Sequence, residues 1–306
     1  MHQLILHHYD FSPFSEKIRL VFGLKKLTWR SVTIPSVMPK PDLVALTGGY
    51  RHTPVLQIGA DIFCDTRLIA RELERRYPQP GLFAPQDRGL ALVIEAWAER
   101  DLFWPIARYV SGINADKLPS VLHADRAALR GKHTPSIRRL KAVAQSNLGV
   151  VHVQLARVEA MLDDERPYLL SETPGLADFA VYHGLWFLGA LPIDCSDVLE
   201  TSTFTKGWMR RLQEIGHCTS TEMSPGEAIE IGRLATPAAQ RPSRPRSFDP
   251  AIGSRVAVLP EEYTTEAVQG DLVFADEDEI AVHRRSETVG DVVVHFPRVG
   301  YVMRQL

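Results

Sequence analysis

The sequence predicts an α/β unit, then an all-α unit, then a small all-β unit at the C-terminal end. Three observations support this fold class. β-Branched runs and helical stretches alternate over residues 1–80, helical periodicity dominates 87–236, and apolar and polar residues alternate along 251–306. Segments rich in proline, at 78–85 and 237–250, separate the three patterns. We therefore expect three domains, at 1–80, 87–236 and 251–306.

The composition narrows the class of protein. The chain has 306 residues, of which 45% are hydrophobic and 24% charged, as in ordinary globular proteins. Its net charge of −2 gives no positive field for nucleic acid or a membrane surface. We expect no signal peptide and no transmembrane helix, because the sequence has neither a basic leader with a long apolar run nor an apolar stretch of about 18 residues. The expected location is the cytoplasm.

The cysteines favour neither a disulfide framework nor a metal site. Cys64, Cys195 and Cys218 lie far apart, and the sequence contains no CxxC, CxxH or HExxH spacing. We expect reduced, packed thiols and no metal.

The first unit reads as strand, helix, strand, loop, two strands and helix. Ser12 suits a helix cap and Pro13 the first helical position, while Asp65 and Thr66 suit the start of the last helix. The expected strands are 3–8, 27–34, 53–58 and 62–64, and the expected helices are 13–24 and 66–77. Pro35, Pro39 and Pro41 make the stretch between 34 and 53 a loop.

The rest of the chain reads as helices and then strands. Helices are expected near 87–114, 120–130, 136–163, 176–190 and 203–215, and Ser224-Pro225-Gly226-Glu227 predicts a further helix start with a capping box. Five short strands are expected at 255–258, 272–274, 280–283, 292–295 and 301–303, which predicts a small barrel or a meander. Residues 254–306 carry ten acidic against five basic side chains, so their net charge of −5 disfavours nucleic acid.

Three places in the first unit could carry chemistry. A hydroxyl at Ser12 would lie at a helix N-terminus, where backbone N–H groups favour negative charge. Thr53-Pro54 enters a strand, and Asp65-Thr66 opens a helix where an amino-acid head group could bind. Taken alone, each is better explained by a helix cap or an ordinary proline.

Taken in this order, the three places resemble the glutathione transferase superfamily. That family has a Ser, Tyr or Cys at the first helix, a cis-proline before the third strand, and an acidic residue with Ser or Thr before the third helix. Here the matching residues are Ser12, Pro54 and Asp65-Thr66, and the helix that follows, 67–73, is similar as well. The segment 175–179 resembles the family's helix-capping segment, with Gly175 in place of the usual Ser or Thr.

The resemblance covers about residues 1–220 and implies a site for glutathione. It implies a thioredoxin-like first domain, a helical second domain, glutathione as cosubstrate and a homodimer. Ser12, or alternatively Tyr9, would stabilise the glutathione thiolate. Thr53 and Pro54 would hold the cysteinyl part, Asp65 and Thr66 the γ-glutamyl head, and Lys40 the glycine carboxylate unless it is only a surface lysine.

The resemblance also implies the activity. Ser12 and Ser15 stand where a redox protein of this fold has cysteines, which excludes dithiol chemistry. We expect a transferase that joins glutathione to a small apolar electrophile. The electrophile pocket would draw on Trp97, Phe103, Trp104 and Tyr109. A non-catalytic binding or regulatory protein is the main alternative, because the loop 49–53 departs from the family pattern, and a glutathione-dependent isomerase or dehalogenase is another. No nucleic acid or membrane partner is expected.

Overall fold

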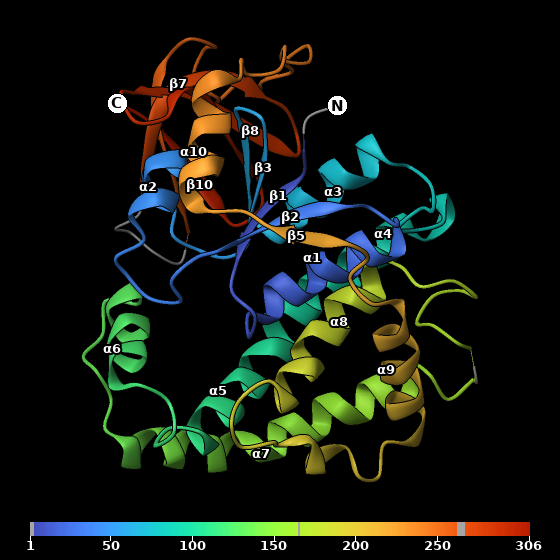
Figure 1. Ribbon diagram of the computed structural model, residues 1–306. Coiled ribbons are helices and arrows are strands. Elements are labelled where there is room, and N and C mark those ends of the chain that lie inside the picture. Colours follow the sequence, from blue (N-terminus) through green and yellow to red (C-terminus); the bar gives the residue numbers. More distant parts are fainter. Residues whose placement is uncertain (1–2, 165, 262–266) are drawn as a thin grey trace.

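The computed structural model describes residues 3–164, 166–261 and 267–306. Two of the ten acidic residues counted in 254–306, Glu262 and Glu266, lie outside the described residues. A large sheet with flanking helices forms one half of the molecule, and a bundle of helices forms the other (Figure 1). This confirms the predicted combination of an α/β unit, an all-α unit and C-terminal strands.

The N-terminal unit follows the predicted order. Its elements are β1 (Ile5–His8), α1 (Pro13–Leu24), β2 (Trp29–Thr33), α2 (Pro41–Thr47), β3 (Val55–Ile58), β4 (Asp61–Cys64) and α3 (Thr66–Arg76). Ser12 caps α1, since its Oγ accepts the N–H of Ser15 at 3.2 Å. The prediction of a loop between the strands ending at 34 and beginning at 53 was wrong in part, because that stretch contains α2. Pro41 occupies the first turn of this helix, where its missing N–H needs no partner.

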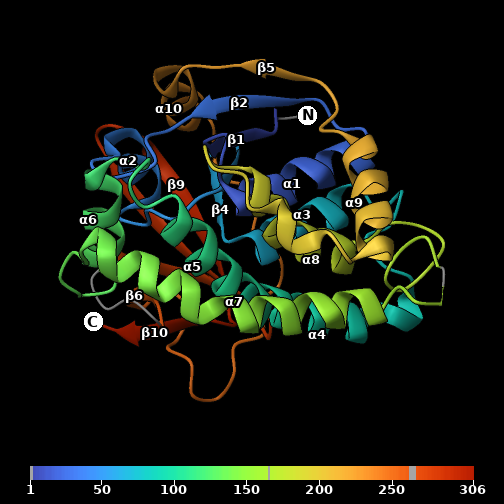
Figure 2. The same cartoon turned by 90° about the horizontal axis from the view of Figure 1, so that it is seen from below.

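The helical unit also agrees with the predicted ranges. It comprises η1 (Pro85–Asp87), α4 (Arg88–Trp97), η2 (Ala98–Leu102), α5 (Phe103–Ile113), α6 (Ser120–Leu129), α7 (Ile137–Ala160), α8 (Leu176–Trp186), η3 (Phe187–Gly189), η4 (Ser196–Leu199) and α9 (Thr203–Ile215). The first expected helix is one rod, 88–113, with a wider turn at η2. Seen from below, α7 runs across the bundle beside α5 (Figure 2).

Gly175 shows why the capping segment departs from the family pattern. Its backbone N–H still donates to Asp178 at 2.9 Å, so the cap of α8 is half formed. A Cβ at this position would lie 2.6 Å from the carbonyl oxygen of Leu82. A serine or threonine would therefore push the chain away from Leu82, whose carbonyl accepts the N–H of Leu176.

After the bundle the chain returns to the sheet. β5 (Ser220–Glu222), which the sequence did not predict, pairs in parallel with β2. The predicted capping box then starts α10 (Pro225–Leu234), with Ser224 and Glu227 each accepting the other's backbone N–H. α10 packs on α2 and on the strand β9 (Gly290–Pro297).

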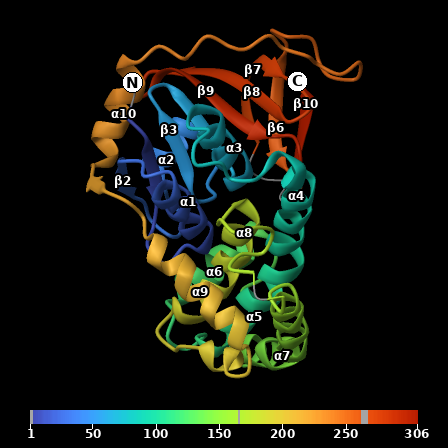
Figure 3. The same cartoon turned by 90° about the vertical axis from the view of Figure 1, so that its right-hand side faces the viewer.

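The C-terminal strands form a meander rather than a closed barrel. They are β6 (Arg255–Pro260), β7 (Val268–Ala275), β8 (Glu279–Ser286), β9 and β10 (Tyr301–Gln305). β9 pairs in parallel with β4, so the strand order is β10-β6-β7-β8-β9-β4-β3-β1-β2-β5. Figure 3 shows these strands beside the N-terminal ones. One sheet of ten strands therefore spans both units.

A buried histidine joins the two parts of this sheet. His295 of β9 lies 3.1 Å from an Asp61 oxygen of β4 and 2.8 Å from a Glu279 oxygen of β8. Its ring stacks on Phe63, with centroids 4.4 Å apart. Burial alone would lower the pKa of His295, but the hydrogen bonds to the two carboxylates outweigh it and raise this pKa to about 9. The imidazole is therefore a buried cation at neutral pH.

Among the residues that the structure describes, no helix has the length and apolar character needed to cross a bilayer.

Candidate functional site

The predicted site residues lie at one edge of the sheet. The strand register places His7 of β1 opposite Val55 of β3, and Val55 opposite Cys64 of β4. The end of β1, the start of β3 and the end of β4 therefore meet there. The loops at these three points carry Ser12, Thr53-Pro54 and Asp65, so the fold brings together the three places that the sequence singled out.

Ser12 places its hydroxyl at the start of α1. Its oxygen accepts the N–H of Ser15, and within the described residues its O–H donates to no protein group. The residue is 2% exposed. The hydroxyl hydrogen is thus free to donate to an anion at the helix N-terminus.

Tyr9, the alternative to Ser12, is half-buried and held by the helical unit. Its phenol oxygen accepts from the Arg126 guanidinium of α6 at 3.1 Å, which leaves its own O–H able to donate. Arg126 also donates to the carbonyl of Ser36, and the neighbouring Asp125 pairs with Arg51. Through these contacts α6 is fixed to the loops around the site.

Lys40 lies beside Thr53, behind the peptide that precedes β3. The Thr53–Pro54 peptide bond is cis, as the family pattern requires. The ammonium of Lys40 donates to the carbonyl of Arg51 at 2.9 Å and to the Thr53 hydroxyl at 3.2 Å. At 2% exposed, Lys40 is not the surface lysine that was weighed as the alternative, and it holds the loop that carries Thr53.

Asp65 caps α3 with a positive φ of 74°. One carboxylate oxygen accepts the N–H of Arg67 at 3.0 Å, and the other accepts the hydroxyl of Tyr301 from β10 at 3.3 Å. The side chain retains lone pairs for a further donor, such as an ammonium group.

A buried charge cluster lies directly behind Asp65. The ammonium of Lys17 is 2.6 Å from both Glu95 and Glu99 and 3.3 Å from the hydroxyl of Thr66, which itself donates to Glu99. Arg67 binds the other Glu99 oxygen at 2.9 Å. Lys17 is fully buried, and α1, α3, α4 and η2 all contribute to the cluster.

The carboxylates of this cluster differ in their pKa values. Burial raises the pKa of Asp65, and the charge of Glu99 raises it further. Burial and Glu99 raise the pKa of Glu95 in the same way. Although burial opposes ionisation, Lys17 and Arg67 hold the pKa of Glu99 at about 2. Asp65 and Glu95 are therefore harder to ionise than Glu99.

The predicted electrophile pocket is only partly available. Tyr109 belongs to the apolar core, and the buried Phe103 packs on Phe14 of α1 with ring centroids 4.8 Å apart. Trp97 packs on the same core, partly buried. Trp104 is half-buried under the guanidinium of Arg130 and lies outside that core.

The sequence analysis missed Lys17, Glu95, Glu99 and Tyr301. Lys17 gave the one usable signal, because with Leu20, Val21 and Leu24 it occupies the apolar face of α1. Nothing local in the sequence connects Tyr301 with Asp65.

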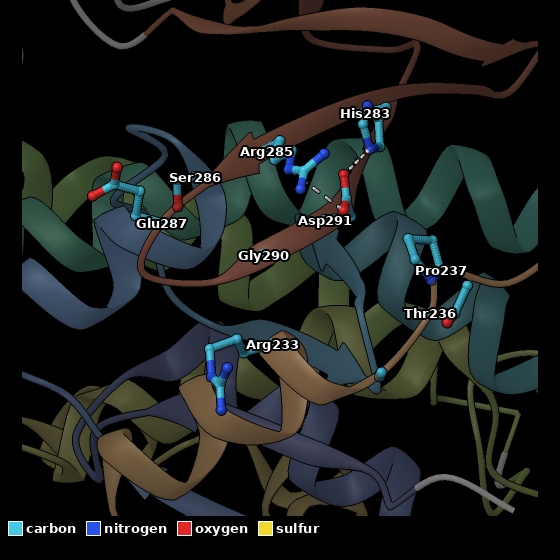
Figure 4. A pocket seen from close by; sticks show the side chains of 10 residues that line it. Arg233, Thr236, Pro237, His283, Arg285, Ser286, Glu287, Gly290 and Asp291 are labelled. Carbon is cyan, nitrogen blue, oxygen red and sulfur yellow. Dashed lines mark hydrogen bonds and ion pairs between the residues drawn. The ribbon is translucent and has the colours of Figure 1, made fainter.

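A separate cavity of about 810 Å³ lies away from this site, between α10 and the hairpin of β8 and β9 (Figure 4). His283 and Arg285 both point toward Asp291 there, at 2.9 Å and 3.8 Å. In the described residues, no cluster of His, Cys, Asp and Glu has a metal-binding arrangement.

Two family models match the chain. Residues 6–81 match a model described as the glutathione S-transferase N-terminal domain, and residues 116–215 match one described as the glutathione S-transferase C-terminal domain. No curated protein sequence matches.

Solved structures show the same likeness. A GST-like protein from Pseudomonas syringae is 36% identical, with a TM-score of 0.81 over 99% of this chain and 100% of that chain. A glutathione S-transferase of Ceriporiopsis subvermispora in complex with glutathione is 16% identical, with a TM-score of 0.55 over 70% of this chain and 98% of that one. A glutathione transferase from Phanerochaete chrysosporium is 18% identical, with a TM-score of 0.56 over 70% and 98%. The Pseudomonas protein is thus similar along the whole chain, C-terminal strands included.

Proposed function

Because the chain belongs to the glutathione transferase superfamily, we propose that it transfers glutathione to a small apolar electrophile, with Ser12 stabilising the thiolate. The glutathione sulfur would form a bond to an electrophilic carbon, and a leaving group or a double bond of the electrophile would take up the electron pair. Catalysis would rest on thiolate stabilisation and proximity.

The observation that carries the proposal is the charge balance behind Asp65. Three buried or half-buried carboxylates, of Asp65, Glu95 and Glu99, face two cations, Lys17 and Arg67. One further cation would balance the cluster, and it would have to approach Asp65, the half-buried member. The α-ammonium of a γ-glutamyl group supplies such a charge, and the free N–H groups at the start of α3 suit the neighbouring carboxylate.

Other residues support the binding of the remaining parts of glutathione. The backbone groups of Thr53 would lie beside the cysteinyl part. Lys40 stabilises the loop that carries Thr53 through its hydrogen bonds to Arg51 and Thr53. The Ser12 hydroxyl, which can still donate, would then meet the sulfur at the N-terminus of α1. A hydrogen bond to the anion favours the thiolate over the thiol.

The test compares Ser12→Ala with Tyr9→Phe. We expect the wild-type protein to bind glutathione in calorimetry and to form thiolate, seen as ultraviolet difference absorbance. In Ser12→Ala the pKa of the bound thiol should rise by about 1–2 units, and the turnover rate should fall about 10- to 100-fold, as for loss of a hydrogen bond to a charged group.

Comparing the two variants shows whether Ser12 or Tyr9 provides the hydroxyl that stabilises the thiolate. If Tyr9→Phe rather than Ser12→Ala raises the pKa of the bound thiol, Tyr9 holds the sulfur. If the wild-type protein binds no glutathione at millimolar concentration, the enzyme proposal fails and the non-catalytic alternative stands.

We also propose that the protein works in the cytoplasm as a homodimer. α4 exposes Leu90, Leu92 and Val93, at 53%, 44% and 64%, and Leu90 and Val93 lie three residues apart on one face of this helix. Exposed apolar groups on one helix face suit a protein interface. Light scattering should give twice the 34.3 kDa of one chain, and Val93→Glu should shift the mass to that of a single chain. A wild-type mass of one chain would contradict this proposal.

A further inference from the structure

The C-terminal strands reach the proposed glutathione site at several points. The guanidinium of Arg284 in β8 lies against Gly48, where a Cβ would come within 2.2 Å of it, and the backbone carbonyl of Ala267 faces Gly49. Arg71 of α3 pairs with Asp278. The strands therefore line the loop that leads to Thr53 as well as the start of α3.

Tyr301 makes the contact that matters most, because it touches Asp65 itself. Its phenol oxygen is 3.3 Å from an Asp65 carboxylate oxygen and 3.3 Å from the phenol oxygen of Tyr50. A carboxylate is the stronger acceptor, so the Tyr301 proton goes to Asp65.

The position of the Tyr301 ring is fixed by its surroundings. The ring packs on Phe296, with centroids 5.5 Å apart, and on Tyr50, at 6.4 Å. The turn before it is held by Arg298, whose guanidinium binds both carboxylate oxygens of Asp249, at 2.7 Å and 2.5 Å. The residue is 9% exposed, so the hydroxyl has little freedom to leave Asp65.

The environment of Asp65 explains the need for such a donor. Glu99 of η2 repels a negative charge there, whereas Arg67 of α3 and Lys17 of α1 attract it, and burial raises the pKa of the neighbouring Cys64 thiol and keeps it neutral. Burial raises the pKa of Asp65. A hydrogen bond from Tyr301 favours the ionised form of the Asp65 carboxyl. Because Tyr301 binds one carboxylate oxygen and the N–H of Arg67 binds the other, the two donors together fix the orientation of the carboxylate.

We propose that Tyr301 is a positioning residue that keeps the Asp65 carboxylate oriented toward the amino group of the thiol cosubstrate. This inference rests on the proposed function. It makes the C-terminal strands part of the binding site, through the Tyr301 hydroxyl on Asp65.

The test pairs a variant with a change in the ligand. Glutathione and its analogue without the α-amino group, glutaryl-cysteinyl-glycine, are titrated by calorimetry into the wild-type protein and Tyr301→Phe. We expect Tyr301→Phe to weaken glutathione binding about tenfold, as for loss of a hydrogen bond to a charged group, and to leave binding of the analogue unchanged. The pH below which glutathione affinity is lost should move upward in the variant, because Asp65 is then harder to ionise.

Two controls separate this role from a structural one. Tyr182→Phe, which removes a buried hydroxyl in α8, should bind both ligands as the wild-type protein does. In an Asp65→Asn background, Tyr301→Phe should have no further effect on glutathione binding.

The outcomes are distinguishable. Equal weakening for both ligands, or no weakening in Tyr301→Phe, would overturn the role of Tyr301 while the proposed function stands. A wild-type protein that binds neither ligand would overturn the proposed function and this inference with it.

Discussion

Lys17→Met should lower the free energy of unfolding by about 3–5 kcal/mol at pH 7.5, the usual cost of removing one partner of a buried ion pair. The substitution keeps the length of the side chain but leaves Glu95 and Glu99 without the ammonium that lies 2.6 Å from each. Urea unfolding followed by circular dichroism measures the change. Glutathione binding should weaken too, because Thr66 loses a hydrogen-bond partner.

A double variant and a surface pair provide the controls. Lys17→Met combined with Glu95→Gln should be more stable than Lys17→Met alone, since the second change removes a stranded charge. Lys141→Met breaks an ion pair with Asp116 whose side chains are about half exposed, and should cost less than about 1 kcal/mol. If both lysine variants lower the free energy of unfolding by the same amount, burial of the Lys17 cluster does not explain its contribution to stability.

Raising the pH should loosen the junction between β4 and β9. The pKa of His295 is raised to about 9 in the folded protein, above its usual 6.5. The charged imidazole therefore contributes its full stabilisation below pH 6.5, and this is lost as pH rises through 9. The loss is on the order of 3 kcal/mol at 1.4 kcal/mol per pKa unit. Urea unfolding at pH 6.5 and at pH 9.5 measures it.

Two histidine variants show which residue causes this pH-dependent loss of stability. His295→Gln should be less stable than the wild-type protein at pH 6.5 and should lack most of the further loss at pH 9.5. His7→Gln should keep the wild-type loss, because burial lowers the pKa of His7 to about 4, so it stays neutral throughout the range. A wild-type slope that persists in His295→Gln would place the titrating group elsewhere.

Local patterns in the sequence predicted most of the elements. Ser12-Pro13 and Ser224-Pro225 start helices where expected, because capping depends on neighbouring residues alone. The five C-terminal strands follow from alternation. β5 could not be predicted from the sequence, because its three residues, 220–222, are polar and exposed and form a strand only by pairing with β2.

The pairing of strands that lie far apart in the chain could not be predicted from the sequence. Alternation shows that 292–295 is a strand but not that β9 lies beside β4, since that depends on the match of Asp61 with Val293 and of Phe63 with His295. The site has the same limit. Ser12, Pro54 and Asp65 were found from motifs, whereas Lys17 and Tyr301 reach the site by contacts across the fold.

The pairing of β4 with β9 limits the order in which the chain can fold. β4 ends at Cys64, but its partner strand β9 ends at Pro297. During synthesis, the edge of β4 therefore stays unpaired until almost the whole chain has been made. Long-range pairing of this kind is slow, because a large loop must close before the contacts form. Until then β4 presents unpaired N–H and C=O groups, which other nascent chains can bind. A chain interrupted before β9 would retain that open edge and be prone to aggregate.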